Sequence, residues 1–133
     1  MKRTGIEIEI HPAGQYILFR LKGVVYARDV LDKIAETYAD LEEPWQYDQL
    51  YDIRGLINVF VYADFVAISD KWREMVGTYR PLHFAIVTTD PLRIDRTQTF
   101  SDMFDNIEAR TFPTVEAASA WLTPATVRES HAS

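Results

Sequence analysis

The sequence contains no cysteine and no long run of apolar residues. Without cysteine the chain can form neither disulfides nor thiolate metal sites, and this composition favours a reducing compartment. A transmembrane helix is excluded because it would need about 18 consecutive apolar residues. The opening segment MKRTGIEIEI alternates isoleucine with glutamate, which is a strand pattern rather than the apolar stretch of a signal peptide. We therefore expect a cytoplasmic protein that does not insert into a membrane.

Clustered basic residues are also missing. The 14 lysines and arginines are scattered, and the net charge is −6. Because nucleic-acid binding depends on clustered positive charge, this class of partner is excluded from the leading hypotheses. A length of 133 residues with 47% hydrophobic residues is typical of one domain with a buried core. We predict a single domain over residues 1–122, followed by a flexible tail over residues 123–133.

Few groupings with catalytic or metal-binding chemistry are present. The three histidines are far apart in the sequence and the glycines are isolated, so neither a Ser/His/Asp arrangement nor a phosphate-binding loop can be placed. The acidic residues Asp102, Asp105 and Glu108 have the spacing of a solvated helix face, with no histidine beside them. We expect no cofactor and no metal, and the pattern favours a protein that is not an enzyme.

The first 22 residues have the pattern of a β-hairpin. Residues 6–11 alternate apolar and polar side chains, residues 12–15 form a turn, and residues 16–22 form the return strand. A four-residue loop pairs Ile10 with Ile17 and Ile6 with Leu21, which places the apolar faces together. Glu7 then lies opposite Arg20 on the polar face.

The rest of the chain alternates helices with strands. We predict an amphipathic helix with its apolar residues between 30 and 41, a strand over 49–54 closed by Gly55, and a helix with an apolar stripe from Phe65 to Tyr79. Residues 82–88 form a continuous apolar run, typical of a central strand covered on both faces. A third helix begins at Asp90 and carries four apolar residues on one face. These are Phe100, Met103, Phe104 and Ile107.

A last strand over 109–112 and a short helix after Pro113-Thr114 complete the order. Strands that alternate with helices pair in parallel through crossover connections. The predicted fold is therefore α/β, with a mixed, mostly parallel five-stranded sheet, an antiparallel N-terminal edge hairpin and about four helices.

Two short motifs add a family resemblance to this order. The first is YDIRG at 51–55, which contains Asp52-Ile53-Arg54-Gly55, and the second is TFPTVEAASAWL at 111–122, which ends in Ala-x-x-Trp-Leu. Together with the element order over about residues 6–122, they resemble the STAS/SEC14-like, or SpoIIAA-like, group of uncharacterised bacterial proteins. The resemblance implies the SpoIIAA/STAS-like fold.

The resemblance implies three functions. Anti-sigma antagonists of the STAS group bind a partner kinase and are switched by phosphorylation of a serine or threonine after the strand that corresponds to residues 49–54. Residues 55–64 contain neither, so the usual phosphorylation switch has no hydroxyl to act on here. SEC14-like relatives hold a lipid or another apolar ligand. The third function is that of a small homodimeric module.

The residues themselves suggest a ligand site at the carboxyl ends of the parallel strands, where open α/β sheets bind ligands. Three arginines there could hold an anion beside helix N-termini. Alternatively, Asp90 caps its helix, while Arg93 and Arg96 are solvated or paired with Asp95 and Asp102. The candidate residues are Tyr26, Asp52, Arg54, Asn58, Phe60, Thr88, Asp90, Arg93 and Arg96.

Asp52 and Arg54 are two positions apart on a strand, so their side chains point to the same face. They form either a catalytic or anion-binding pair, or a structural salt bridge that includes Arg20 or Lys22. A catalytic Asp52 would lie in a cleft with a raised pKa. We favour the structural interpretation.

Three hypotheses about function follow. The first is a non-enzymatic protein-interaction or regulatory module, a homodimer or a partner of another protein. The second is a binder of a small apolar or anionic ligand in a cavity lined by Tyr26, Arg54, Phe60 and Thr88. The third is an enzyme that uses Asp52 and Arg54. The apolar connection over residues 56–62 could be core, interface or pocket wall.

Overall fold

The computed structural model describes residues 5–76, 81–103 and 107–123. The strands are β1 (Ile6–His11), β2 (Tyr16–Gly23), β3 (Asp48–Leu56), β4 (Leu82–Val87) and β5 (Ile107–Phe112). The helices are α1 (Ala27–Ala39), α2 (Tyr62–Val76), α3 (Pro91–Asp102) and α4 (Val115–Leu122), with a 3₁₀ turn, η1, at Pro44–Gln46. Residues 124–133 of the predicted tail, together with Tyr79 and Phe104, lie outside the described residues.

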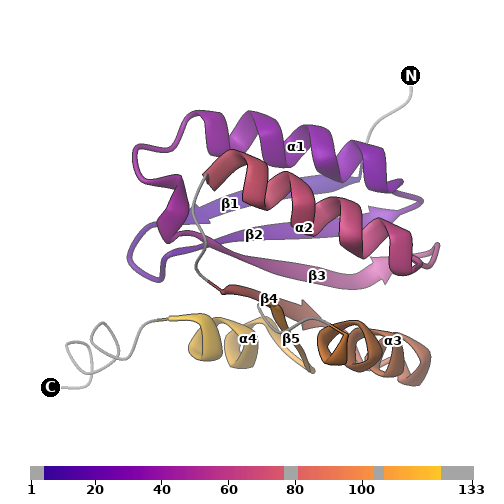
Figure 1. The fold of residues 1–133 in the computed structure, drawn as a ribbon. Coiled ribbons are helices and arrows are strands. Elements are labelled where there is room, and N and C mark those ends of the chain that lie inside the picture. Colours follow the sequence, from indigo (N-terminus) through magenta and orange to yellow (C-terminus); the bar gives the residue numbers. More distant parts are fainter. Residues whose placement is uncertain (1–4, 77–80, 104–106, 124–133) are drawn as a thin grey trace, which may run out of the picture.

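The strands form one sheet whose order follows the chain, β1-β2-β3-β4-β5 (Figure 1). β1 pairs with β2 in antiparallel orientation, and the other three pairings are parallel. The predicted mixed α/β fold with an N-terminal edge hairpin is therefore confirmed.

The hairpin has the predicted register. Ile6 pairs with Leu21, Glu7 with Arg20 and Ile10 with Ile17. Because side chains alternate between the faces of a strand, this register buries one row of the hairpin and leaves glutamates on the other face. The turn contains Gln15 with a positive φ of 58°, and the Gln15 N–H donates to the Pro12 carbonyl at 3.2 Å.

Helices cover the two faces of the sheet unequally. The larger core unites side chains from α1, α2 and α3 with one face of the sheet, and Trp72 and Ile34 at its centre are fully buried. Figure 1 shows α1 and α2 side by side along β1, β2 and β3. On the other face, α4 covers a smaller apolar cluster around Leu18, Leu50 and Val87. The rest of that face, on β1 and β2, carries the exposed Glu7 and Glu9.

β4 is buried on both faces, as its continuous apolar run predicts. Phe84 and Ile86 belong to the larger core, whereas Ala85 and Val87 belong to the cluster under α4. β4 is therefore covered by apolar side chains on both faces of the sheet.

Two predicted boundaries are wrong. The apolar face of the third helix does not reach Ile107, because α3 ends at Asp102 and β5 begins at Ile107. Residues 107–110 alternate buried and exposed, which is the period of a strand and not of a helix. Met103, the C-cap of α3, is 56% exposed instead of packed.

Gly55 does not close β3, which continues to Leu56. A β-bulge lies at this point, because Arg20 pairs with Asp52 while Lys22 pairs with Gly55. A Cβ atom on Gly55 would lie 3.3 Å from the Lys22 Cγ, a tight contact between neighbouring strands. The glycine therefore serves close packing within the bulge, and the positive φ found in this region belongs to Gly23.

Candidate functional site at the carboxyl ends of the strands

The segments that follow β2 and β3 are bonded to each other. The Ile57 N–H donates to the Gly23 carbonyl at 2.8 Å. The Asn58 side chain then accepts from the Val25 N–H at 3.0 Å and donates to the Val25 carbonyl at 2.8 Å. Asn58, a predicted ligand residue, is thus engaged with backbone and fixes the two connections side by side.

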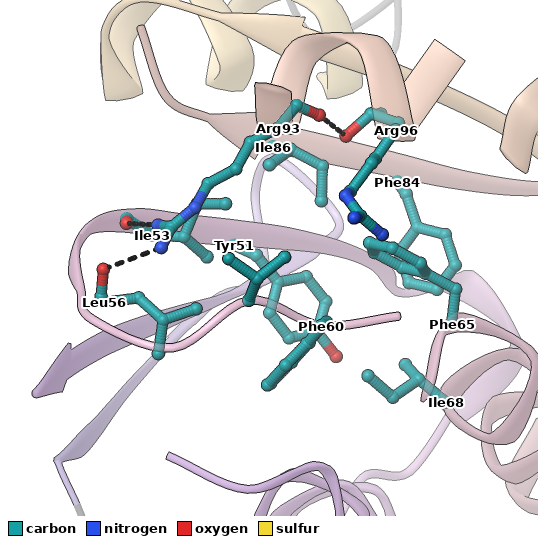
Figure 2. A pocket seen from close by; sticks show the side chains of 12 residues that line it. Tyr51, Ile53, Leu56, Phe60, Phe65, Ile68, Phe84, Ile86, Arg93 and Arg96 are labelled. Atoms are coloured by element: carbon teal, nitrogen blue, oxygen red, sulfur yellow. Dashed lines mark hydrogen bonds between the residues drawn. The ribbon is translucent and has the colours of Figure 1, made fainter. Parts of the chain in front are cut away.

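Arg93 holds the end of β3 to α3 (Figure 2). Its Nη1 donates to the Ile53 carbonyl at 3.0 Å. Its Nη2 lies 3.0 Å from the carbonyls of Leu56 and Asn58, and 3.4 Å from that of Ile57. The guanidinium group therefore satisfies backbone acceptors at the irregular end of a strand, where ladder partners are absent.

The first turn of α3 determines the position of Arg93. The Asp90 side chain accepts from the Arg93 N–H at 3.0 Å, and Pro91 occupies the first helical turn. Both features match the predicted helix start. Asp90 caps α3 as the alternative drawn from the sequence states, but Arg93 pairs with neither Asp95 nor Asp102, because its donors are occupied by carbonyls.

An apolar cavity of about 40 Å³ lies between the end of β3, β4, α2 and α3 (Figure 2). Aromatic and aliphatic side chains form most of its wall, and two arginines stand among them. The lining residues are Tyr51, Ile53, Leu56, Val59, Phe60, Phe65, Ile68, Phe84, Ile86, Arg93, Arg96 and Thr97. Its apolar walls favour an apolar occupant.

A wider groove of about 260 Å³ lies beside this cavity, between α2 and α3. Phe65 and Arg96 line both spaces. The Arg96 side chain points from α3 toward the aromatic rings of the cavity wall (Figure 2). Within the part of the chain that the structure describes, the Arg96 side chain has no hydrogen-bond or ion-pair partner.

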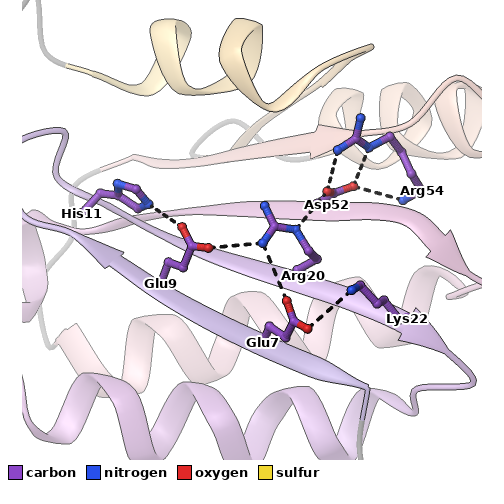
Figure 3. A network of polar contacts seen from close by, with 7 residues as sticks. All are labelled: Glu7, Glu9, His11, Arg20, Lys22, Asp52 and Arg54. Carbon is purple, nitrogen blue, oxygen red and sulfur yellow. Dashed lines mark hydrogen bonds and ion pairs between the residues drawn. The ribbon is translucent and has the colours of Figure 1, made fainter.

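Asp52 and Arg54 lie on the opposite face of β3, in a network of charged side chains (Figure 3). Arg54 donates from Nε to one oxygen of Asp52 at 2.9 Å and from Nη2 to the other at 2.8 Å. The Arg54 backbone N–H adds a bond of 3.2 Å, and Arg20 Nε adds one of 3.4 Å. Glu7 and Glu9 extend the network onto β1 through Arg20.

These contacts determine the acidity of Asp52. Burial, with 5% of the side chain exposed, raises the pKa of Asp52, but the hydrogen bonds from Arg54 and Arg20 outweigh burial and hold the pKa below its usual value. The hydrogen bond to Asp52 raises the pKa of Arg54. The hypothesis of a catalytic Asp52 predicts a raised pKa for this residue. The lowered pKa does not meet that prediction.

The structure identifies the cross-strand partner of Asp52 and Arg54. The cross-strand salt bridge runs from Asp52 to Arg20, and Lys22 pairs instead with Glu7 at 3.4 Å. The network joins three neighbouring strands on the same face of the sheet as α4, on the part of that face that α4 leaves uncovered.

The predicted cavity residues are only partly brought together. Of the four that were expected to line one cavity, only Phe60 does so. Arg54 points to the other face, Tyr26 is 52% exposed, and Thr88 is buried with its hydroxyl accepting from the Asp90 N–H at 3.1 Å. Arg93 and Arg96 do line the cavity, in different roles.

Most of the cavity wall was not predicted as a site. Tyr51 and Ile53 alternate with Asp52 and Arg54, so the strand period places them on the opposite face from the predicted pair. Phe65 and Ile68 belong to the apolar stripe of α2, which indicated core and gave no sign of a cavity. The Tyr51 hydroxyl donates to Gln49 Oε1 at 2.9 Å, and burial raises its pKa well above the ordinary value.

The apolar connection over residues 56–62 is divided between core and surface. Leu56 and Phe60 are buried, at 6% and 9% exposure. Ile57, Val61 and Tyr62 are 71%, 50% and 48% exposed. The buried Leu56 is thus followed by the exposed Ile57, and the buried Phe60 by the exposed Val61.

No helix among the described residues is long and apolar enough to cross a membrane. Over the same residues, no group of three or more histidine or acidic side chains is placed to hold a metal ion.

The strand order, the antiparallel hairpin and the four α-helices define a SpoIIAA-like α/β fold. A solved structure of an uncharacterised protein from Shewanella loihica PV-4, described as a DUF3478 family protein with a SpoIIAA-like fold, is similar to this chain with a TM-score of 0.61. The similarity covers 92% of this chain and 97% of that chain at 18% sequence identity, and it shows the fold alone. No family model and no curated protein matches this chain. The resemblance drawn from the two short motifs is confirmed at the level of the fold.

Proposed function

We propose that the protein is a non-enzymatic interaction module that forms a homodimer through the carboxyl end of its sheet. The observation that supports this is a group of six exposed apolar side chains in the connections after β2 and β3 and at the first residue of α2, which we call the apolar rim. It consists of Val24, Tyr26, Ile57, Val59, Val61 and Tyr62, each between 39% and 71% exposed.

The two connections that carry most of the rim lie side by side, because they are hydrogen-bonded between Gly23 and Ile57 and between Val25 and Asn58. Eleven large apolar side chains of the described residues are exposed, and the rim holds six of them. Gathered apolar side chains of this kind mark interaction surfaces, whereas scattered ones do not. The rim is therefore the surface we assign to a partner.

A second copy of the chain is the partner that we assign to the rim, because the rim has no charge that would oppose it. The chain carries a net charge of −6, so two copies repel each other over most of their surface. The six rim residues carry no charge, and across a two-fold axis such a patch contacts itself without opposing like charges. Another protein remains the second assignment for the same surface.

Sedimentation equilibrium over the micromolar range tests this proposal. We expect a dimer for the unaltered protein and a monomer for Ile57→Asp combined with Val61→Asp, because buried unpaired carboxylates are strongly unfavourable. Ile10→Asp is the matched control, since Ile10 is 45% exposed and lies at the opposite end of the sheet. A monomer for the unaltered protein contradicts the homodimer and moves the assignment to a different protein partner.

We further propose a bacterial origin and a cytoplasmic location, which rest on the resemblance and on the absence of cysteine. The enzyme hypothesis is the least favoured of the three. Asp52 is covered by four hydrogen bonds and has a lowered pKa, and neither property suits proton transfer at neutral pH.

A further inference from the structure

We propose that the cavity and groove between α2 and α3 bind a short-chain monocarboxylate, with its apolar tail in the cavity and its carboxylate on Arg96. Every group that the site uses belongs to one chain, and the site shares Val59 and Tyr62 with the apolar rim.

The apolar part of the site accepts only a small group. At about 40 Å³ the cavity is well below the roughly 150 Å³ that holds benzene, and it takes the end of an aliphatic chain. The adjoining groove, at about 260 Å³, has room for the remaining methylene groups beside Phe65 and Phe100. A lipid acyl chain is too long for this space, and a short aliphatic tail fits it.

The charge at the mouth of the cavity selects an anion. Among the residues that line the cavity, Arg93 and Arg96 are positive and none is acidic. Asp95 lines the outer groove, so the two guanidinium groups leave an excess of one positive charge across the combined site.

The two arginines differ in what they can bind. The Nη donors of Arg93 are occupied by the carbonyls after β3, whereas Arg96 has no partner among the described residues and points toward the aromatic wall. The planar guanidinium group of Arg96 matches the two oxygens of one carboxylate. We therefore assign the carboxylate of the ligand to Arg96. Arg93 instead holds the end of β3 that forms part of the cavity wall.

A titration of the full ¹⁵N-labelled chain with hexanoate, followed by the shifts of its amide NMR signals, tests the site. We expect saturable shifts in α2, α3 and residues 53–60. Acetate keeps the charge without the tail, and 1-hexanol keeps the tail without the charge. Each should bind at least about tenfold more weakly than hexanoate, because each loses one of the two contributions.

Two pairs of variants locate the contacts. Arg96→Gln should weaken hexanoate about five- to tenfold, whereas Arg28→Gln, which removes an exposed arginine stacked on Tyr26, should leave it unchanged. Val59→Trp should abolish binding by filling the mouth of the cavity, and Val61→Trp, on an exposed residue that does not line it, should not. A folded amide spectrum for each variant excludes loss of structure as the cause. The proposal is overturned if hexanoate produces no saturable shifts, if 1-hexanol binds equally well, or if either pair of variants behaves alike.

Discussion

The two faces of β3 carry opposite chemistry at the same end of the strand. On one face, Asp52 and Arg54 pair with each other and, through Arg20, with β1, and their charges are compensated. On the other face, Tyr51 and Ile53 line an apolar cavity whose mouth holds Arg93 and Arg96. The charged pair that the sequence suggested as a site therefore has a structural role on one face of β3. The cavity lies on the other face, where the strand contributes apolar residues.

The largest expected effect is on the cavity side, from Arg93→Ala. Four carbonyls within 3.4 Å lose their donor, and we expect a loss of about 2–3 kcal/mol in the free energy of unfolding. Urea denaturation measures it. The matched control is Arg96→Ala, three residues along the same helix, which should change stability by less than about 0.5 kcal/mol. Equal losses for the two variants would show that Arg93 does not hold the end of β3.

A smaller loss is expected on the polar face, from Asp52→Asn. The variant keeps the shape of the side chain but removes the charge that Arg20 and Arg54 share, and we expect about 1–2 kcal/mol of destabilisation. The value is limited because the Arg54 side chain is 49% exposed and its interaction is screened by solvent. Hexanoate binding should be the same in this variant as in the unaltered protein, because Asp52 does not line the cavity. Loss of hexanoate binding in a folded Asp52→Asn protein would show that the two faces of β3 are coupled.

The pH dependence of stability provides a third measurement. The pKa of Asp52 is lowered in the folded state, so its contribution is present above the ordinary carboxyl pKa of 3.8 and is lost as pH falls through the folded value. The difference in stability between the unaltered protein and Asp52→Asn should therefore be constant near neutral pH and shrink below about pH 4. Denaturation at stepped pH checks this. A difference that grows on acidification would contradict the lowered pKa.

The smallest effect is expected at the outer part of the network. Glu7→Gln and Lys22→Gln remove a salt bridge of 3.4 Å between side chains that are 57% and 60% exposed. Each should change the free energy of unfolding by less than about 0.5 kcal/mol, because exposed ion pairs contribute little. Thermal or urea denaturation at low and high salt measures the effect. A large salt-dependent loss would show that these exposed ion pairs contribute substantially to the free energy of unfolding.

The sequence predicted those features that depend on neighbouring residues. Alternation over residues 6–11 gave the hairpin register with Arg20 opposite Glu7, and Asp90-Pro91 gave the start of α3. The shared face of Asp52 and Arg54 followed from the strand period alone.

Features that depend on distant residues could not be predicted. The partners of Arg93 lie 35 to 40 positions away in the chain, and their carbonyls are available only because the end of β3 is irregular. The bulge at Gly55 has no signature that separates it from a strand end, since glycine suits both. The cavity arises from imperfect packing between α2, α3 and the sheet, and an apolar stripe has the same pattern whether it packs fully or leaves a space.

The order of the strands has a consequence for how the protein folds. Because the sheet follows the chain from β1 to β5, each strand pairs with its predecessor, and no strand must wait for a distant segment. Sequence-adjacent pairing lowers the mean separation of contacting residues, which is associated with faster folding. The N-terminal hairpin can form as soon as its own residues leave the ribosome, and every later strand–helix unit then adds to an edge that is already in place.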